Sequence, residues 1–219
     1  MSQGLAHLIE RSADLKRDLV QFAQGPRFER ALTAGLLEVA GPERELDEAE
    51  TIGVIDRFAL QYRLPDGKTV VDRFVASRPD LTETDREMLL GWRDPMEGIF
   101  EIGGKDRESI VLLNLLDDLE YRTYSNMGPA VFRPLPRGEF VLARLVPIRP
   151  VPGAWLVSGP MSSYSKSGAA QVAQVALDLA TRRPELVFRN PKKVEQGWKQ
   201  MRQDRAAFVE FFGGDVLVA

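Results

Sequence analysis

Five short runs of β-branched and aromatic residues lie close together in the middle of the chain, and no other feature limits the possible folds as much. Gly, Pro, Asp and Asn, which favour turns, separate the runs. The runs cover residues 98–102, 109–113, 120–124, 140–146 and 154–158. Strands this short and this closely spaced predict one small, curled antiparallel sheet or barrel of the SH3 or OB size class.

Helical periodicity flanks these runs on both sides. Before residue 94, apolar residues recur three and four apart, and Gly25 followed by Pro26 separates the first two expected helices. An acidic stretch over residues 43–50 suits the start of a further helix, and Thr82 begins a short one. Whether residues 69–76 form a helix or an extended segment stays open.

The helical period returns after the β-type runs. One helix begins near Lys166 and is stopped by Pro184, and a last helix covers residues 191–212. The last helix is expected to turn its apolar residues inward, namely Val194, Trp198, Met201, Phe208 and Phe212. The sequence therefore predicts an α+β protein with a helical region at 1–93, a small antiparallel β region at 94–160, and C-terminal helices at 161–219 that pack on the rest.

The residue types that the chain lacks exclude several kinds of site. The 219 residues contain no cysteine and a single histidine, His7. Disulfides, iron–sulfur clusters, thiolate zinc sites and a cysteine nucleophile are therefore excluded, and no metal or other cofactor is predicted. His7 lacks an evident nucleophile and an orienting acid, so a surface role is favoured. Asp94, Glu97 and Glu101 follow Trp92 and could line a groove, although solvated loop charges explain them more simply. No catalytic residue is assigned.

Overall charge and hydropathy favour a cytoplasmic protein without membrane contact. The formal net charge is −3, and charged residues interrupt the N-terminal segment before an apolar run reaches signal-peptide length. No stretch of the sequence is apolar for the length of a membrane span. A net negative charge also gives no general attraction to nucleic acid.

A basic stretch over residues 182–205 departs from this overall charge. Phe188 and Trp198 lie among its cations, and positive charge beside aromatic rings is typical of surfaces that bind RNA or DNA. A solvated helix face with buried aromatic residues gives the same pattern, and the acidic stretch could neutralise it within the molecule. The candidate nucleic-acid-binding residues are Arg182, Arg183, Arg189, Lys192, Lys193, Lys199 and Arg202.

A serine-rich segment before the helix near Lys166 offers a second candidate site. Ser165, Lys166 and Ser167 provide hydroxyls and a cation at a helix start, where phosphate groups bind. The spacing differs from a Walker A loop, and serines that cap a helix in a plain linker explain the segment equally well. Phosphate binding at these residues is therefore a hypothesis.

Residues 58–159 resemble a region of uncharacterised bacterial proteins that often precedes a SEC-C zinc motif. The resemblance is carried by Phe58, the turn at residues 64–69, the segment 98–102, residues 143–145 and the Ser158–Gly159 pair. The family implies no known activity, and the cysteines of the zinc motif are missing here. The function that we expect is a non-enzymatic interaction module with an unknown protein partner. The alternatives are a nucleic-acid-binding protein and an enzyme or binder of a phosphorylated small molecule.

Overall fold

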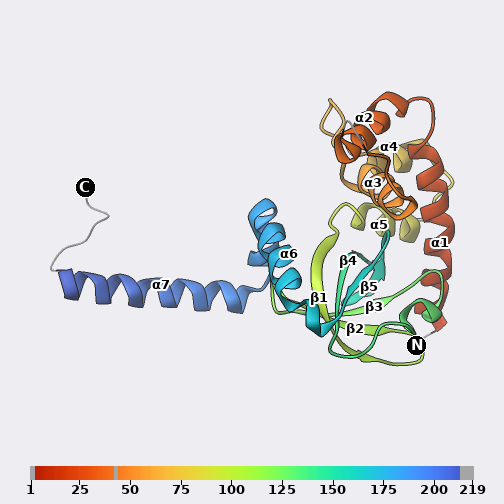
Figure 1. The fold of residues 1–219 in the computed structure, drawn as a ribbon. Helices are drawn as coiled ribbons and strands as arrows, with labels where there is room; N and C mark the ends of the chain where they lie inside the picture. The colour runs from red at the N-terminus through yellow and green to blue at the C-terminus, as the bar shows by residue number, and fades with distance from the viewer. Residues whose placement is uncertain (1–2, 42–43, 213–219) are drawn as a thin grey trace.

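Helices at both ends of the chain flank a small β-barrel (Figure 1). The structure is a computed structural model that describes residues 3–41 and 44–212. The predicted α+β class is confirmed, with the barrel in the middle of the chain. None of the helices within the described residues is long and apolar enough to cross a membrane.

Five helices precede the barrel, and side-chain caps explain where three of them begin. They are α1 (Gln3–Ala23), α2 (Glu29–Ala40), α3 (Glu48–Gln61), α4 (Val70–Ser77) and α5 (Glu83–Gly91). Capping boxes at Asp47, Thr69 and Thr82 satisfy the first backbone amides of α3, α4 and α5. The segment whose conformation the sequence left open is thus helical, because Thr69 and Asp72 cap each other.

Each of the five expected runs forms a strand, and a short sixth strand follows. The strands are β1 (Met96–Lys105), β2 (Ile110–Asn114), β3 (Glu120–Tyr124), β4 (Phe140–Pro147), β5 (Ala154–Val157) and β6 (Ser162–Tyr164). The order β1-β2-β3-β5-β4 closes into a barrel because β4 also pairs with β1. β3 and β5 run parallel, so the expectation of an antiparallel sheet is wrong for this one pair. The strand order and the parallel pair are those of an OB-type barrel.

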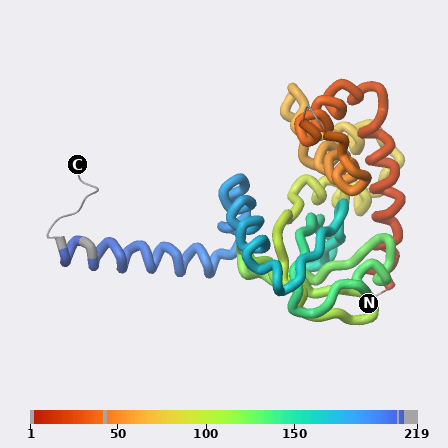
Figure 2. The backbone as a smooth tube through the Cα atoms, in the orientation of Figure 1, coloured from red at the N-terminus to blue at the C-terminus, as the bar shows by residue number. Residues whose placement is uncertain are grey.

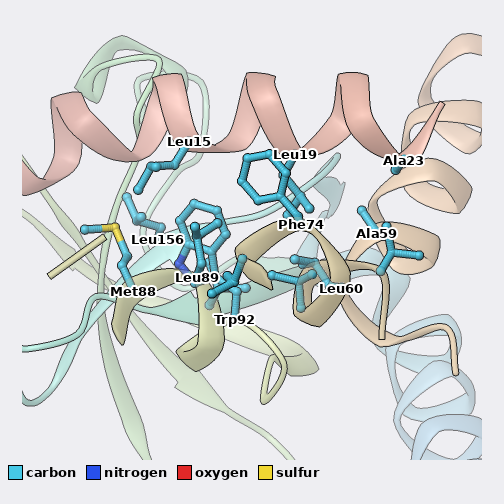
Figure 3. Close-up of a cluster of buried hydrophobic side chains, with 14 of the residues drawn as sticks. Leu15, Leu19, Ala23, Ala59, Leu60, Phe74, Met88, Leu89, Trp92 and Leu156 are labelled. Carbon is cyan, nitrogen blue, oxygen red and sulfur yellow. The ribbon is translucent and has the colours of Figure 1, made fainter. Parts of the chain in front are cut away.

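Two hydrophobic clusters hold the fold together. The first joins the N-terminal helices to the outside of the barrel, where Leu15 and Leu19 of α1 face Phe74, Trp92 and Leu156 (Figure 3). The second fills the barrel and extends to α6 (Ala169–Arg182) and to a 3-10 helix, η3 (Pro184–Arg189). The helical part and the barrel therefore share a continuous apolar contact.

The last helix has the predicted length, but it does not pack on the rest of the protein as predicted. α7 (Pro191–Phe212) has the expected bounds, yet it projects away from the barrel beyond α6 (Figure 1, Figure 2). Trp198 is 55% exposed and Met201 is 58% exposed, so the expectation that they point inward is wrong. The side chains of Phe208 and Phe212 lie outside the described residues. A 3-4 spacing identifies the apolar face of a helix, but it does not identify what covers that face.

Candidate functional site

A pocket of about 770 Å³ lies between the N-terminal helices and the barrel. One face of α1 and one face of α3 form its helical walls, because Lys16 and Val20 are spaced by one turn, as are Ile52 and Asp56. Gln24, directly after α1, continues the first of these walls. The barrel contributes residues that follow β3 and β5. The volume lies within the range of roughly 300–1,000 Å³ that is typical of ligand pockets.

Four polar side chains, of which three are buried and Lys16 is partly buried, meet where the helices and the barrel come together. Asp56 of α3 accepts a hydrogen bond from Arg144 Nη1 at 2.9 Å and hydrogen bonds from Ser158 Oγ at 2.9 and 3.0 Å. Lys16 of α1 forms an ion pair with Asp56 and donates to Ser158 Oγ at 2.8 Å. Asp56 and Ser158 are both 3% exposed. We call Lys16, Asp56, Arg144 and Ser158 the buried ion cluster; all but Arg144 line the pocket.

The buried ion cluster keeps Asp56 ionised. Burial alone raises the pKa of the Asp56 carboxyl, but Lys16 and Arg144 together hold it below its usual value. Burial lowers the pKa of the Lys16 ammonium, while Asp56 favours its charged form. Around neutral pH the two groups therefore form a buried ion pair, with Arg144 as an additional cation.

The chain turns sharply after β5 to place Ser158 in this cluster. Gly159, the next residue, has a φ of +78°, a backbone conformation that residues other than glycine rarely adopt. Its Cα also lies close to the carboxylate, since a Cβ added there would be 3.5 Å from Asp56 Oδ2. Both the backbone conformation and the nearby carboxylate therefore explain why a glycine follows Ser158.

Two side chains at the pocket have N–H groups without a hydrogen-bond acceptor among the described residues. The indole Nε1 of Trp92 is buried and has no partner among the described residues, although the side chain lines the pocket. The Lys16 ammonium has three N–H groups, of which Asp56 and Ser158 accept two, and it lies 5.6 Å from the centre of the Trp92 ring. The Lys16 ammonium at the inner wall of the pocket can therefore donate to an acceptor on a bound molecule.

The mouth of the pocket combines exposed apolar side chains with carboxylates. Ile52 is 46% exposed and Met127 is 81% exposed, although both are large apolar residues. Asp47 and Glu48 lie at the start of α3 and also line the pocket. Ile52 lies on α3 and faces this open pocket.

The carboxylates near Trp92 do not gather into an acid/base pair. Glu97 is held by three arginines, with Arg57 at 2.7 Å, Arg144 at 3.6 Å and Arg183 at 3.8 Å. Asp94 pairs with Arg189 of η3. These residues stabilise the packing of η3 and α3 against β1 and leave no shared catalytic space.

Most of the predicted nucleic-acid-binding residues are engaged with carboxylates. Their acidic partners belong to neighbouring elements: Arg182 pairs with Asp178, Arg183 with Glu97 and Glu185, Arg189 with Asp94, and Lys193 with Asp118. Lys192, Lys199 and Arg202 are exposed and form no ion pair within the described part of the chain. Arg44 pairs with Glu50 inside the acidic stretch, so the described residues show no pairing between the two stretches.

The serine-rich segment lies on the surface. Ser165, Lys166 and Ser167 are all exposed, and the two serine hydroxyls are 2.7 Å apart. Neither of the two best-formed pockets in the described structure is lined by these residues. Phosphate binding at this segment stays a prediction without an enclosed space to support it.

Sequence reasoning missed the buried ion cluster, because its members are distant in the chain. Lys16 and Ser158 are 142 residues apart, and Asp56 and Ser158 are 102 residues apart. Comparison with protein-family models, with curated proteins and with solved structures finds no match to this chain. The resemblance of residues 58–159 to the region that precedes SEC-C motifs therefore stays a prediction, and the function is inferred from the site alone.

Proposed function

We propose that this protein is a non-enzymatic interaction module that takes up an apolar segment of a macromolecular partner in the pocket between α1, α3 and the barrel. The observation that carries the proposal is the combination of apolar walls with an exposed apolar mouth at Ile52 and Met127. Isolated exposed apolar residues are common on proteins, but here they border a concave space of ligand size.

The buried ion cluster supports a binding role better than a catalytic one. Ser158 donates a hydrogen bond to Asp56, and the lowered pKa of Asp56 makes this carboxylate a weak base for activating a hydroxyl. Lys16 is ion-paired with Asp56, whereas a lysine base must be neutral. The cluster instead fixes the helices on the barrel, and thereby fixes the shape of the pocket between them.

Substitution of Ile52 by Asp is expected to weaken the binding of a neutral apolar probe, N-phenyl-1-naphthylamine, by about tenfold or more. The new carboxylate would lose much of its hydration whenever the probe covers it, and Asp47 and Glu48 nearby add repulsion. A fluorescence titration on protein dilute enough to have the mass of one chain measures the affinity and the stoichiometry, and we expect one probe per unmodified chain.

Leu37→Asp is the matched control for this titration. Leu37 is 63% exposed on α2 and does not line the pocket, so its replacement introduces the same charge at a distance from the site. Equal loss of affinity in both variants would show that the probe binds elsewhere. Absence of probe binding to the unmodified protein, at dilutions where it has the mass of one chain, would contradict the proposed site.

Nucleic-acid binding by α7 is a second candidate, favoured by one observation. Trp198 is exposed, and the neighbouring Lys199 and Arg202 form no ion pair in the described residues, so a ring for stacking lies beside unneutralised cations. Fluorescence anisotropy of labelled single-stranded RNA and DNA over a salt series tests it. Affinity that Lys199→Glu with Arg202→Glu leaves unchanged would rule out this surface.

A further inference from the structure

α7 carries an apolar face that no other part of the described structure covers. Val194, Trp198 and Met201 are separated by four and three residues and therefore lie on one side of the helix. Beyond Val194, every α7 side chain that the structure describes is exposed. In Figure 2 the helix leaves the body as a single projecting rod, about 33 Å long at the standard rise per residue.

This arrangement points to a partner for α7. Helices in proteins gain most of their stability from packing of an amphipathic face, and large apolar side chains on such a face are costly to leave in water. The first turn of α7 is anchored, because Lys193 Nζ donates to the Leu116 carbonyl at 2.8 Å and pairs with Asp118. The rest of the helix therefore extends away from the body of the protein, starting from this anchored first turn.

The chemistry of the pocket complements this helix. α7 carries five lysines and arginines against three carboxylates, and Arg202, one turn after Trp198, borders its apolar face. The pocket has apolar walls, and Asp47 and Glu48 stand at its mouth. Glu48 forms no ion pair within the described residues, so it is open to a cation from outside.

α7 does not reach the pocket of its own chain. The pocket lies between α1, α3 and the barrel, whereas α7 runs away from the barrel on the side of α6 (Figure 1). The acidic and the basic stretches are therefore complementary in charge but are apart within one molecule. A contact between them requires two copies.

We propose that the pocket of one copy receives α7 of a second copy, and that reciprocal exchange of the two helices closes a dimer. Trp198 and Met201 enter the apolar pocket beside Ile52, while Arg202 faces Asp47 and Glu48. Reciprocal exchange repeats the same contact twice, as a two-fold symmetric dimer requires. This inference names the partner for the proposed function and rests on it.

Two full-length variants and their mixture test the proposal. The helix variant carries Trp198→Asp and Met201→Asp, and the pocket variant carries Glu48→Lys and Ile52→Lys; all four side chains are exposed, so the fold should tolerate the changes. Light scattering coupled to gel filtration measures the mass. We expect the unmodified protein to have the mass of two chains and each variant alone to have the mass of one chain.

An equimolar mixture of the two variants is expected to regain a two-chain species. The intact α7 of the pocket variant can still enter the intact pocket of the helix variant, so one of the two contacts survives. The dissociation constant of the mixed dimer should be larger than that of the unmodified dimer by about tenfold or more. Self-pairing of α7 would instead leave the pocket variant dimeric and the mixture without new dimers, and either result would overturn the proposal. An unmodified protein that is monomeric at every concentration would also overturn it.

The apolar probe separates failure of this inference from failure of the proposed function. The helix variant has an intact, unoccupied pocket and should bind N-phenyl-1-naphthylamine at least as tightly as the unmodified protein does. If the protein binds the probe but never dimerises, the pocket is still supported as a docking site, and α7 is ruled out as its occupant. A helix variant that is monomeric and binds no probe would discard both.

Discussion

Replacement of Asp56 by Ala is expected to lower the free energy of unfolding by about 3–5 kcal/mol, the cost of leaving buried charges without their partner. Asp56 accepts hydrogen bonds from Arg144 and Ser158 and pairs with Lys16. Its removal leaves Lys16 without a counter-ion among the described residues and leaves Arg144 with Glu97 alone, at 3.6 Å. Denaturant unfolding, extrapolated linearly to water, measures the change.

Asp178→Ala is the matched control for this loss. Asp178 pairs with Arg182 one turn later on α6, but both side chains are more than half exposed. Exposed pairs of this kind contribute little, so we expect a change within about 0.5 kcal/mol. Lys16→Met added to Asp56→Ala should recover part of the loss, because it removes one stranded cation. A change of less than about 1 kcal/mol for Asp56→Ala would contradict the role given to the buried ion cluster.

The destabilisation caused by Asp56→Asn should diminish at low pH. The pKa of Asp56 in the folded state lies below its ordinary value of 3.8, because Lys16 and Arg144 outweigh the effect of burial. Its contribution to stability is thus fully present above pH 3.8 and is lost as the pH falls through the lower, folded-state value. A protonated Asp56 resembles Asn, so the two proteins should approach equal stability in acid.

Unfolding curves of both proteins from pH 7 to pH 2 test this dependence. Other carboxylates with lowered pKa values, such as Asp72 and Asp85, also lose their contributions in acid. Both proteins carry these groups, so the difference between the two curves isolates Asp56. A difference that stays constant over the whole range would mean that Asp56 is not ionised in the folded protein.

Local patterns allowed most of the fold to be predicted. Short β-type runs between turn residues located the five barrel strands, and Thr82 located the start of α5. The parallel pairing of β3 with β5 was missed, because it depends on how the barrel closes and not on either strand alone. Similarly, the bounds of α7 follow from its periodicity, while its projection into solvent depends on the absence of a partner surface.

The pocket could not be predicted, although its polar residues left a trace in the sequence. Lys16 and Asp56 occupy positions on otherwise apolar helix faces, beside Leu19 of α1 and Ala59 of α3. A charge in such a position indicates a buried partner, but it does not say which of many opposite charges that partner is. Only the packing of α1 and α3 on the barrel brings the buried ion cluster together.

Methyl NMR of the full chain with 13C-labelled methionine tests the central claim, that the pocket receives an apolar helix, most directly. Met127 reports on the mouth of the pocket and Met201 on α7, while Met88 and Met96 are fully buried and serve as controls. Over a dilution series, the Met127 and Met201 signals should shift together with the same concentration dependence, and the signals of the two buried methionines should stay in place. A Met201 signal that shifts while Met127 does not would contradict the claim.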